Sequence, residues 1–426
     1  MSEPVPLWLD CDPGHDDTFA ILLAAYHPHI QLLGISTVHG NASLEKTTRN
    51  ALSVLSAIGK LDDVPVHQGA AQALHRAPIH APTDIHGESG LDGTALLPPP
   101  PADRLAAVIA NASASASSGS TTTTTTAAMA AALRATKPGT AWIAATGSMT
   151  NVAALFQAHP DLAAHIGGLS IMGGSVGDGF TAAVMGQVDG KARVGNYTPW
   201  AEFNILIDPE AAAELFGNET LARKTTLVPL DLTHLVLATR EVQDLLLYGP
   251  EGVEGKEGGV GVGEGGGSAT AAAAVGAGAG AGATGEKKAK SELRVMLIEL
   301  LNFFAATYRD TFGIVEGPPL HDPLAVAAVL AGTGAHEIPF YDYNPAQDPP
   351  SRRERFAVEV ITEGTLDDAV QRGAQTGRTV VKLLPPGSEG VRIPRGLDIP
   401  RFWREIEACC QRADEVNRKK RLAAMA

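Results

Sequence analysis

The stretch DCDPGHDD at residues 10–17 lies between two apolar segments near the start of the chain. Residues 5–9 are mostly apolar and predict a strand, whereas residues 18–26 are apolar and rich in helix formers, which predicts a helix. A strand, a tight Pro-Gly turn and a helix form the first half of a βαβ unit. The stretch therefore predicts an α/β fold whose ligands bind at the carboxyl edge of a sheet.

The same stretch concentrates negative charge on four aspartates: Asp10, Asp12, Asp16 and Asp17. Four carboxylates so close repel one another unless a positive group lies among them, and a helix amino terminus offers only a partial charge. A hard divalent cation with oxygen ligands, Ca²⁺ or Mg²⁺, relieves this repulsion. The residue order is that of neither an EF-hand loop nor a P-loop. A solvated acidic turn that caps a helix would need only one Asp.

Other polar residues stand at the ends of further predicted strands. Asn41 follows the apolar segment 30–38, and Thr146 follows the segment 141–145. The carboxyl ends of parallel strands meet at one edge of a sheet, so we expect these residues near the acidic stretch. A lone Asn after a glycine is also an ordinary turn residue.

Glu202 and Asn204 form another polar pair. On an extended segment, residues two apart point to the same face. A carboxylate and an amide on one face can hold a vicinal diol through complementary hydrogen bonds. If these two residues are considered by themselves, an exposed polar face explains them about as well as a diol-binding site does.

Composition changes sharply in two segments, 111–126 and 249–286, which we expect to be disordered insertions because they are too poor in apolar residues to form a core. Residues 177–194 predict an elaborated loop. Residues 287–312 predict a long helix with an apolar stripe that includes Tyr308.

Charge and cysteine content limit the classes of partner. The formal net charge of −14 argues against nucleic acid, because phosphate binding needs a basic surface, but leaves neutral ligands open. Three cysteines make no disulfide framework, so we expect a reducing compartment, the cytoplasm or also the nucleus. We expect neither a secretory signal nor a membrane span, since the required apolar runs are missing from the sequence.

Taken together, these blocks resemble the nucleoside hydrolases of the inosine-uridine preferring type, which cleave the N-glycosidic bond of ribonucleosides. The similarity lies in DCDPGHDD and in six later blocks: VHGN at 38–41, IHGESGLDG at 85–93, TGSMTN at 146–151, GN at 195–196, AEFN at 201–204 and HDP at 321–323. It implies one domain over residues 1–426, with a Rossmann-like, open and mostly parallel sheet flanked by helices. The segment YRDTFG at 308–313 is most similar to fungal uridine nucleosidases, which favours uridine and related pyrimidine nucleosides.

The resemblance also implies roles for individual residues. One Ca²⁺ per subunit would be held by four of them: Asp12, Asp17, Asp322 and the carbonyl of Thr146. Asp12 would also take a proton from water as general base, Asp10 would orient the ligands, and His321 would protonate the departing base. The remaining residues would contact ribose and base: Asp16, Asn41, His86, Met172, Asn196, Glu202, Asn204 and Tyr308. We further expect a homodimer or homotetramer.

Three alternatives stay open from the sequence. One is a purine-preferring or broad nucleoside hydrolase, and another is a nucleoside-binding protein without catalysis. The third is an Asp-dependent phosphohydrolase, whose motif also begins with Asp-x-Asp at a strand end. That class would place Gly-Thr or Gly-Val after the second Asp, where this chain has Pro13-Gly14.

Overall fold

A six-stranded sheet organises the computed structural model, which describes residues 3–116, 124–252, 288–343 and 353–425. Its strand order is β3-β2-β1-β4-β5-β8, and all neighbours are parallel. The strands are β1 (Val5–Cys11), β2 (Ile30–Thr37), β3 (Val66–Gln68), β4 (Trp142–Ala145), β5 (Gly168–Met172) and β8 (Thr225–Val228). The strand order reverses between β1 and β4, where doubly wound folds bind their ligands. The expected open parallel sheet is confirmed.

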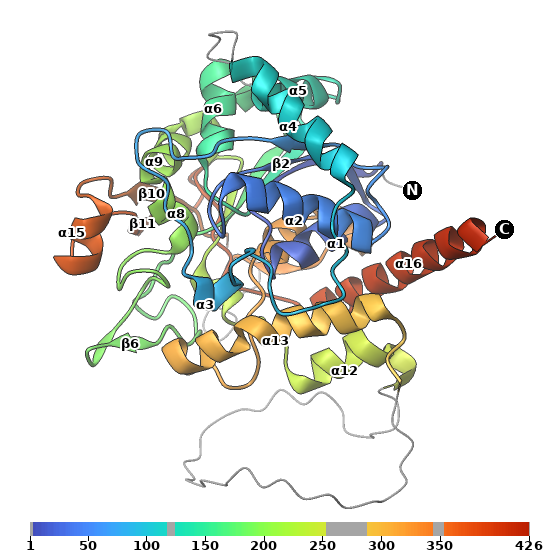
Figure 1. Cartoon of the computed structure of the whole chain (residues 1–426). Helices are drawn as coiled ribbons and strands as arrows, with labels where there is room; N and C mark the ends of the chain where they lie inside the picture. Colours follow the sequence, from blue (N-terminus) through green and yellow to red (C-terminus); the bar gives the residue numbers. More distant parts are fainter. Residues whose placement is uncertain (1–2, 117–123, 253–287, 344–352, 426) are drawn as a thin grey trace, which may run out of the picture.

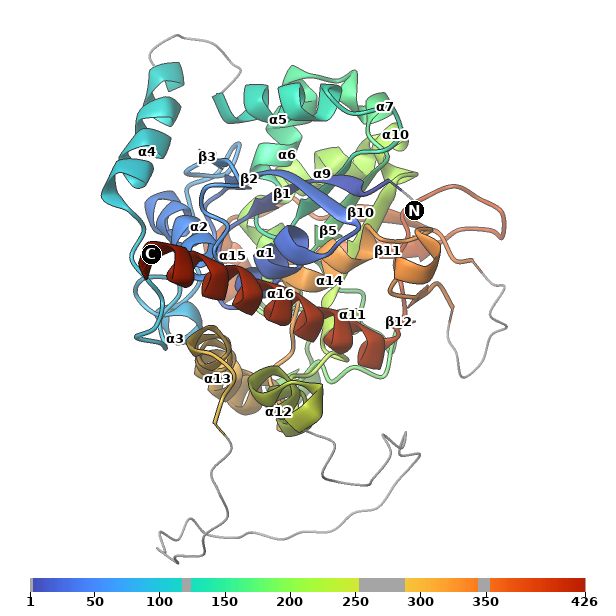
Figure 2. The same cartoon turned by 90° about the vertical axis from the view of Figure 1, so that its right-hand side faces the viewer.

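Side chains alternate along β1 between two buried faces. Leu7 and Leu9 join a core formed with α1 (Asp17–Tyr26), α14 (Asp322–Ala328) and α16 (Ile399–Met425). Trp8 points to the other face and joins a core formed with α5 (Thr124–Arg134), α6 (Thr150–Ala158) and α9 (Pro209–Gly217). Because helices cover both faces of the sheet, the strand residues that point to either face are apolar. Figures 1 and 2 show the two helical layers on either side of the sheet.

The other elements connect and flank these layers. The remaining helices are α2 (Leu44–Ala57), α3 (Thr83–His86), α4 (Ala102–Ala116), α7 (Leu162–His165), α8 (Phe203–Ile207), α10 (Glu219–Ala222), α11 (Leu230–Thr233), α12 (Arg240–Tyr248), α13 (Glu292–Phe312) and α15 (Leu366–Gln371), with 3₁₀ turns at Pro250–Gly252 and Gly334–His336. Three antiparallel pairs complete the described strands: β6 (Gln187–Val188) with β7 (Lys191–Ala192), β9 (Phe340–Tyr341) with β12 (Gly396–Leu397), and β10 (Phe356–Val360) with β11 (Thr379–Leu383).

Helix α13 is held at both ends by local chemistry. The Ser291 hydroxyl accepts a hydrogen bond from the Arg294 backbone N–H, so the helix begins at Glu292 rather than at 287 as we predicted. It ends at Gly313, whose φ of +74° suits glycine. The buried Arg294 side chain pairs with Glu407 at 3.0 Å and with Asp414 at 2.7 Å, both on α16. These ion pairs place α13 against the main body of the fold.

The structure describes only the ends of the two predicted low-complexity insertions. Helix α4 continues to Ala116 and α5 begins at Thr124, so both ends of the segment 111–126 are helical, whereas 117–123 lie outside the described residues. The expectation of disorder at those ends was wrong because α4 and α5 pack on each other and on β3. Of the segment 249–286, residues 253–286 lie outside the described residues.

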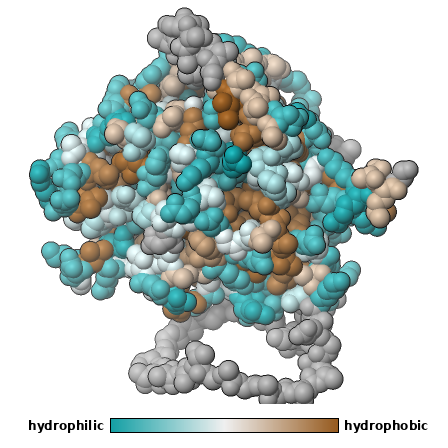
Figure 3. All heavy atoms as spheres, viewed as in Figure 1, coloured by the Kyte–Doolittle hydropathy of each residue, from teal (hydrophilic) through white to brown (hydrophobic). Residues whose placement is uncertain are grey.

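The surface drawn in Figure 3 has hydrophilic and hydrophobic residues interspersed. No helix in the described part of the chain combines the length and apolar character that a membrane crossing requires.

Candidate active site

A cavity of about 270 Å³ opens at the carboxyl ends of the strands. It is lined by many of the residues predicted from the sequence: Asp16, Asn41, His86, Thr146, Met172, Asn196, Glu202, Asn204, Tyr308, His321 and Asp322. Asp10, Asp12 and Asp17 are fully buried residues of the same region. The structure therefore brings together blocks that are more than 300 residues apart in sequence.

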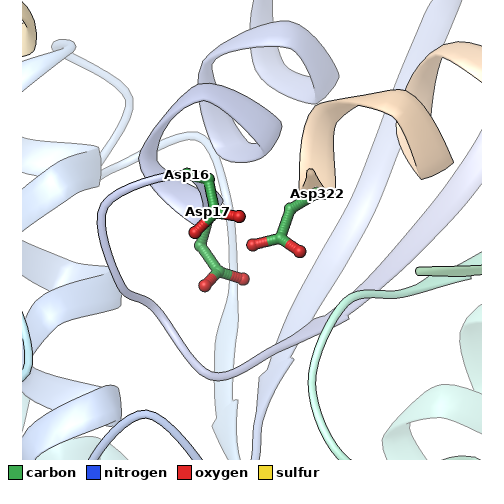
Figure 4. A group of neighbouring side chains, drawn as sticks. All are labelled: Asp16, Asp17 and Asp322. Carbon is green, nitrogen blue, oxygen red and sulfur yellow. The ribbon is translucent and has the colours of Figure 1, made fainter. Parts of the chain in front are cut away.

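Three carboxylates form the acidic end of this cavity. Asp16 and Asp17 begin α1, Asp322 begins α14, and oxygen atoms of all three lie within 4.8 Å of one another. Figure 4 shows them turned toward the same space from the starts of the two helices. Burial and the neighbouring Asp17 raise the pKa of Asp16 to about 7, and burial with the surrounding aspartates raises the pKa of Asp322 well above its ordinary value. A cation among them would reverse both effects.

Asp12 lies directly beyond β1 with only one oxygen satisfied. Its Oδ2 accepts a hydrogen bond of 2.7 Å from the Asn41 backbone N–H. Its buried Oδ1 has no hydrogen-bond partner among the described residues. A Cβ at Gly40 would overlap the carboxylate, and one at Gly147 would lie 2.7 Å from Oδ1, so both glycines are needed for this close approach. An orphaned carboxylate oxygen beside three further carboxylates fits a bound cation and its water.

Thr146 joins the first and fourth strands of the sheet to this cluster. Its hydroxyl donates to Oδ1 of Asp17 at 2.9 Å, and its backbone N–H donates to the Asp10 carbonyl at 2.8 Å. The Thr146 carbonyl accepts from the Asn204 side-chain amide at 2.9 Å. Carbonyl oxygen has a second lone pair, so a cation could still be held there.

Asp10 lies behind the cavity wall. It accepts a hydrogen bond from the Asn151 amide at 2.8 Å and another from the Ser36 hydroxyl. Burial raises its pKa to about 7 despite these bonds. Asp10 therefore ties β1 to β2 and α6, in keeping with an orienting role.

Glu202 and Asn204 reach the cavity by a different geometry from the one we predicted. Glu202 is the N-cap of α8, and its carboxylate accepts from the backbone N–H groups of Asn204 at 2.9 Å and Ile205 at 3.1 Å. The prediction of an extended segment was therefore wrong. Glu is not among the favoured N-cap residues, so the sequence gave no signal that a helix begins there. Both side chains still line the same cavity.

The other predicted sugar contacts already hold parts of the site together. The Asn41 side-chain amide donates to the Asp12 carbonyl at 3.1 Å and to Oδ2 of Asp17 at 3.3 Å. The Asn196 side-chain carbonyl accepts from the Phe203 backbone N–H at 2.9 Å. Both residues thus brace neighbouring groups while lining the cavity.

Both ring nitrogens of His321 contact hydroxyl groups. Nδ1 of His321 lies 2.6 Å from the Thr233 hydroxyl, which itself donates to the Leu230 carbonyl at 3.4 Å. In the tautomer in which the Thr233 proton points to the Leu230 carbonyl, Nδ1 donates to Thr233 and Nε2 accepts the hydrogen bond from the Tyr308 hydroxyl at 2.7 Å. Burial lowers the pKa of His321 well below its ordinary value, so the ring is neutral.

A second histidine pair gives His86 a defined orientation. His15 Nε2 lies 2.8 Å from the Asp92 carbonyl and must donate to it, so its Nδ1 accepts from Nδ1 of His86 at 3.0 Å. The remaining nitrogen of His86, Nε2, is then an acceptor. His15 was missed in the sequence, although it stands within the acidic stretch.

Sequence reasoning also missed the aromatic and cationic part of the cavity wall. The additional side chains include Arg193, Tyr197, Phe203, Phe304, Thr311 and Phe312. The residues on α13 follow the three- and four-residue spacing from Tyr308, which is the signal that would have found them. Arg193 belongs to the elaborated loop, which has no such periodicity.

Comparison with known proteins adds the family context. Residues 7–404 match the model of the inosine-uridine preferring nucleoside hydrolases. The chain is 34% identical to the uridine nucleosidase of Saccharomyces cerevisiae over 97% of this chain and 98% of that protein. It is 33% identical to the pyrimidine-specific ribonucleoside hydrolase RihA of Photobacterium profundum over 76% of this chain and 79% of that protein.

Solved structures agree on the fold. The purine-preferring ribonucleoside hydrolase of Gardnerella vaginalis superposes with a TM-score of 0.62 at 23% identity. That superposition covers 96% of this chain and 99% of the other chain.

Proposed function

The chain belongs to the inosine-uridine preferring nucleoside hydrolases, and on that premise we propose that its preferred substrates are pyrimidine ribonucleosides, uridine first. The reaction is hydrolysis of the N-glycosidic bond to ribose and free base. The observation that carries this function is the buried group of Asp16, Asp17 and Asp322 beside the unpartnered oxygen of Asp12. Support for uridine comes from the names of the similar proteins from yeast and Photobacterium.

We assign Ca²⁺ to the acidic end because the available donors are all oxygen, which suits a hard cation rather than zinc or copper. Four residues would hold it: Asp12, Asp17, Asp322 and the Thr146 carbonyl. Asp16 belongs to the same carboxylate group and is a further candidate ligand. When bound, the ion lowers the pKa of water and polarises ribose hydroxyls.

In the mechanism that we propose, Asp12 is the general base. Its Oδ1 is buried and uncommitted among the described residues, so it can accept a proton from water as the water oxygen attacks C1′ of the ribose. Positive charge develops on the ribose ring as the bond to the base breaks. The surrounding carboxylates stabilise that charge, while Asn41, Glu202 and Asn204 orient the hydroxyls.

The departing base needs a proton, and Tyr308 with His321 can supply it. We propose that the Tyr308 hydroxyl donates to the neutral imidazole, with the proton on the tyrosine rather than on the Nε2 atom of His321 in the ground state. His321 would hold that hydroxyl in place. The Tyr308 O–H bond would break as its proton passes to the leaving nitrogen of the base, and the tyrosinate would regain a proton from water after the base departs. His86, with Nε2 as acceptor, lies on the same cavity wall.

A panel of substrates tests the proposal. The full-length protein is incubated with uridine, cytidine, inosine and adenosine, with added Ca²⁺ or with a chelator, and free base is measured. Uridine should give the highest kcat/KM, and the chelator should abolish turnover. Highest activity on purines would contradict the pyrimidine preference. Phosphate release from phosphomonoesters, or uridine binding without turnover, would favour the alternative classes.

We also propose that the protein is a homodimer or homotetramer in the cytoplasm or nucleus. The three cysteines are free and buried, as suits a reducing compartment. Light scattering on the purified protein and fluorescence microscopy of a tagged chain test the two statements separately.

A further inference from the structure

We propose that Arg193 selects bases that carry an oxo group at the position furthest from the sugar, namely the 4-oxo group of uracil or the 6-oxo group of hypoxanthine. This inference rests on the proposed function, because it assigns base recognition within the same cavity. It explains a charged residue that the mechanism above does not use.

The position of Arg193 is set by its backbone and side chain together. It follows strand β7, its backbone N–H donates to the Gly186 carbonyl at 3.2 Å, and its side chain lines the cavity while only 8% exposed. Nε donates to the Gly195 carbonyl at 2.8 Å, and Nη2 donates to the Asn196 carbonyl at 2.9 Å. These two bonds hold the guanidinium plane in one orientation.

Some N–H groups of the Arg193 guanidinium make no hydrogen bond among the described residues. It has five N–H groups, and within the described part of the chain Nη1 has no hydrogen-bond partner and no carboxylate pairs with Arg193. Burying a cation without a counter-charge is costly. A substrate acceptor that meets Nη1 would recover part of that cost.

Neighbouring rings place Arg193 at the base end of the cavity. Its guanidinium carbon lies 4.8 Å from the centre of the Phe312 ring, which is stacked on Tyr308 at 5.2 Å. Phe312 also meets His234 edge-on at 5.4 Å. With ribose at the acidic end, a planar base would extend toward these aromatic side chains, on which it can stack.

The chemistry of the guanidinium then decides between bases. Arginine only donates, so it pairs with an oxo group and opposes the amino group that cytosine and adenine carry at the corresponding position. A site built to hydrogen-bond one substrate group discriminates strongly against an analogue that lacks it. Arg193 thus favours uridine over cytidine and inosine over adenosine.

The test compares Arg193→Met, Arg193→Lys and the control Arg378→Met. Arg378 also lies over an aromatic ring, that of Trp200 at 5.0 Å, but neither residue lines the cavity. In Arg193→Met, the ratio of kcat/KM for uridine over cytidine should fall about 10- to 100-fold, as expected for loss of a charge-assisted hydrogen bond. Arg193→Lys should recover part of the ratio, and Arg378→Met should keep it. Thermal unfolding checks that each variant is folded.

Binding provides an independent readout. In an Asp12→Asn background, calorimetry should show that Arg193→Met weakens uridine binding about 10-fold or more, while cytidine binding changes less than about 3-fold. Equal losses for both nucleosides would overturn the proposal and indicate a structural role. A loss confined to uridine 5′-monophosphate would overturn it in favour of phosphate binding.

The two proposals fail in different ways. If the wild-type protein releases no base from any nucleoside, the proposed function is wrong. If it hydrolyses uridine but the uridine-to-cytidine ratio survives in Arg193→Met, only the role of Arg193 is wrong.

Discussion

The hydroxyl oxygen of Tyr308 lies 2.7 Å from Nε2 of His321, and both side chains are buried in the cavity wall. With Nδ1 of His321 donating a hydrogen bond to the Thr233 hydroxyl, the tyrosine is the donor of this pair. The pair joins α13 to the start of α14, and hence the base end of the cavity to the acidic end. Its role in catalysis can be separated from its role in packing.

Removing only the Tyr308 hydroxyl tests proton delivery to the base. Tyr308→Phe keeps the ring stacked against Phe312 but leaves no donor, so kcat for uridine should fall about 100-fold or more. A riboside with a p-nitrophenolate leaving group needs no protonation and should lose far less. Steady-state kinetics on both substrates provide the measurement. Equal losses on the two would show that the hydroxyl serves only to hold the structure.

Replacement of Asp12 tests the general base. Asp12→Asn preserves the shape of the side chain but cannot take up a proton, so kcat should fall about 10³-fold or more with the fold intact. Asp178→Asn, an exposed position in the loop before β6, is a matched control and should retain full activity. Normal hydrolysis by Asp12→Asn would refute the assignment.

Calcium should change stability as well as activity. The buried carboxylates repel one another, so added Ca²⁺ should raise the unfolding temperature, corresponding to about 2.7 kcal/mol at a hundredfold excess over Kd. Asp322→Asn removes one of the repelling charges, so without metal it should unfold at the same temperature as the wild type or higher. The rise in its unfolding temperature on adding Ca²⁺ should be much smaller than that of the wild type. Scanning calorimetry with and without a chelator measures both effects, and identical calcium responses would contradict the site.

Acid should destabilise the protein through His27, outside the active site. Burial, with the charge of Arg412, lowers the pKa of His27 to about 4, although Glu405 lies 3.6 Å away. The unfolded chain, with a histidine pKa near 6.5, binds the proton first as pH falls. Stability from this group is complete above pH 6.5 and is lost as pH falls toward 4.

The expected loss is about 2 kcal/mol between pH 7 and pH 5. Urea unfolding of the wild type and His27→Gln at these two pH values measures it. From pH 7 to pH 5, the change in unfolding free energy of the variant should be about 2 kcal/mol less unfavourable than that of the wild type. An equal change in unfolding free energy in the two proteins would mean that His27 has the same pKa in the folded and the unfolded state.

Several features of this protein follow from its sequence by itself. A continuous apolar run around Trp8, and the Pro-Gly turn after β1, indicate a buried strand followed by a helix, because these signals act within a few residues. The concentration of aspartates likewise points to a cation before any coordinates are known.

Other features were decided only by the tertiary structure. Asp16 joins the carboxylate group because α14 starts beside α1, Glu202 caps a helix instead of lying in an extended segment, and Thr233 contacts the ring of His321. Arg193 reaches the base end of the cavity only because its loop folds against α13. Each of these depends on partners distant in sequence, and hydrogen bonds and charge repulsion act through spatial proximity, which a linear pattern does not contain.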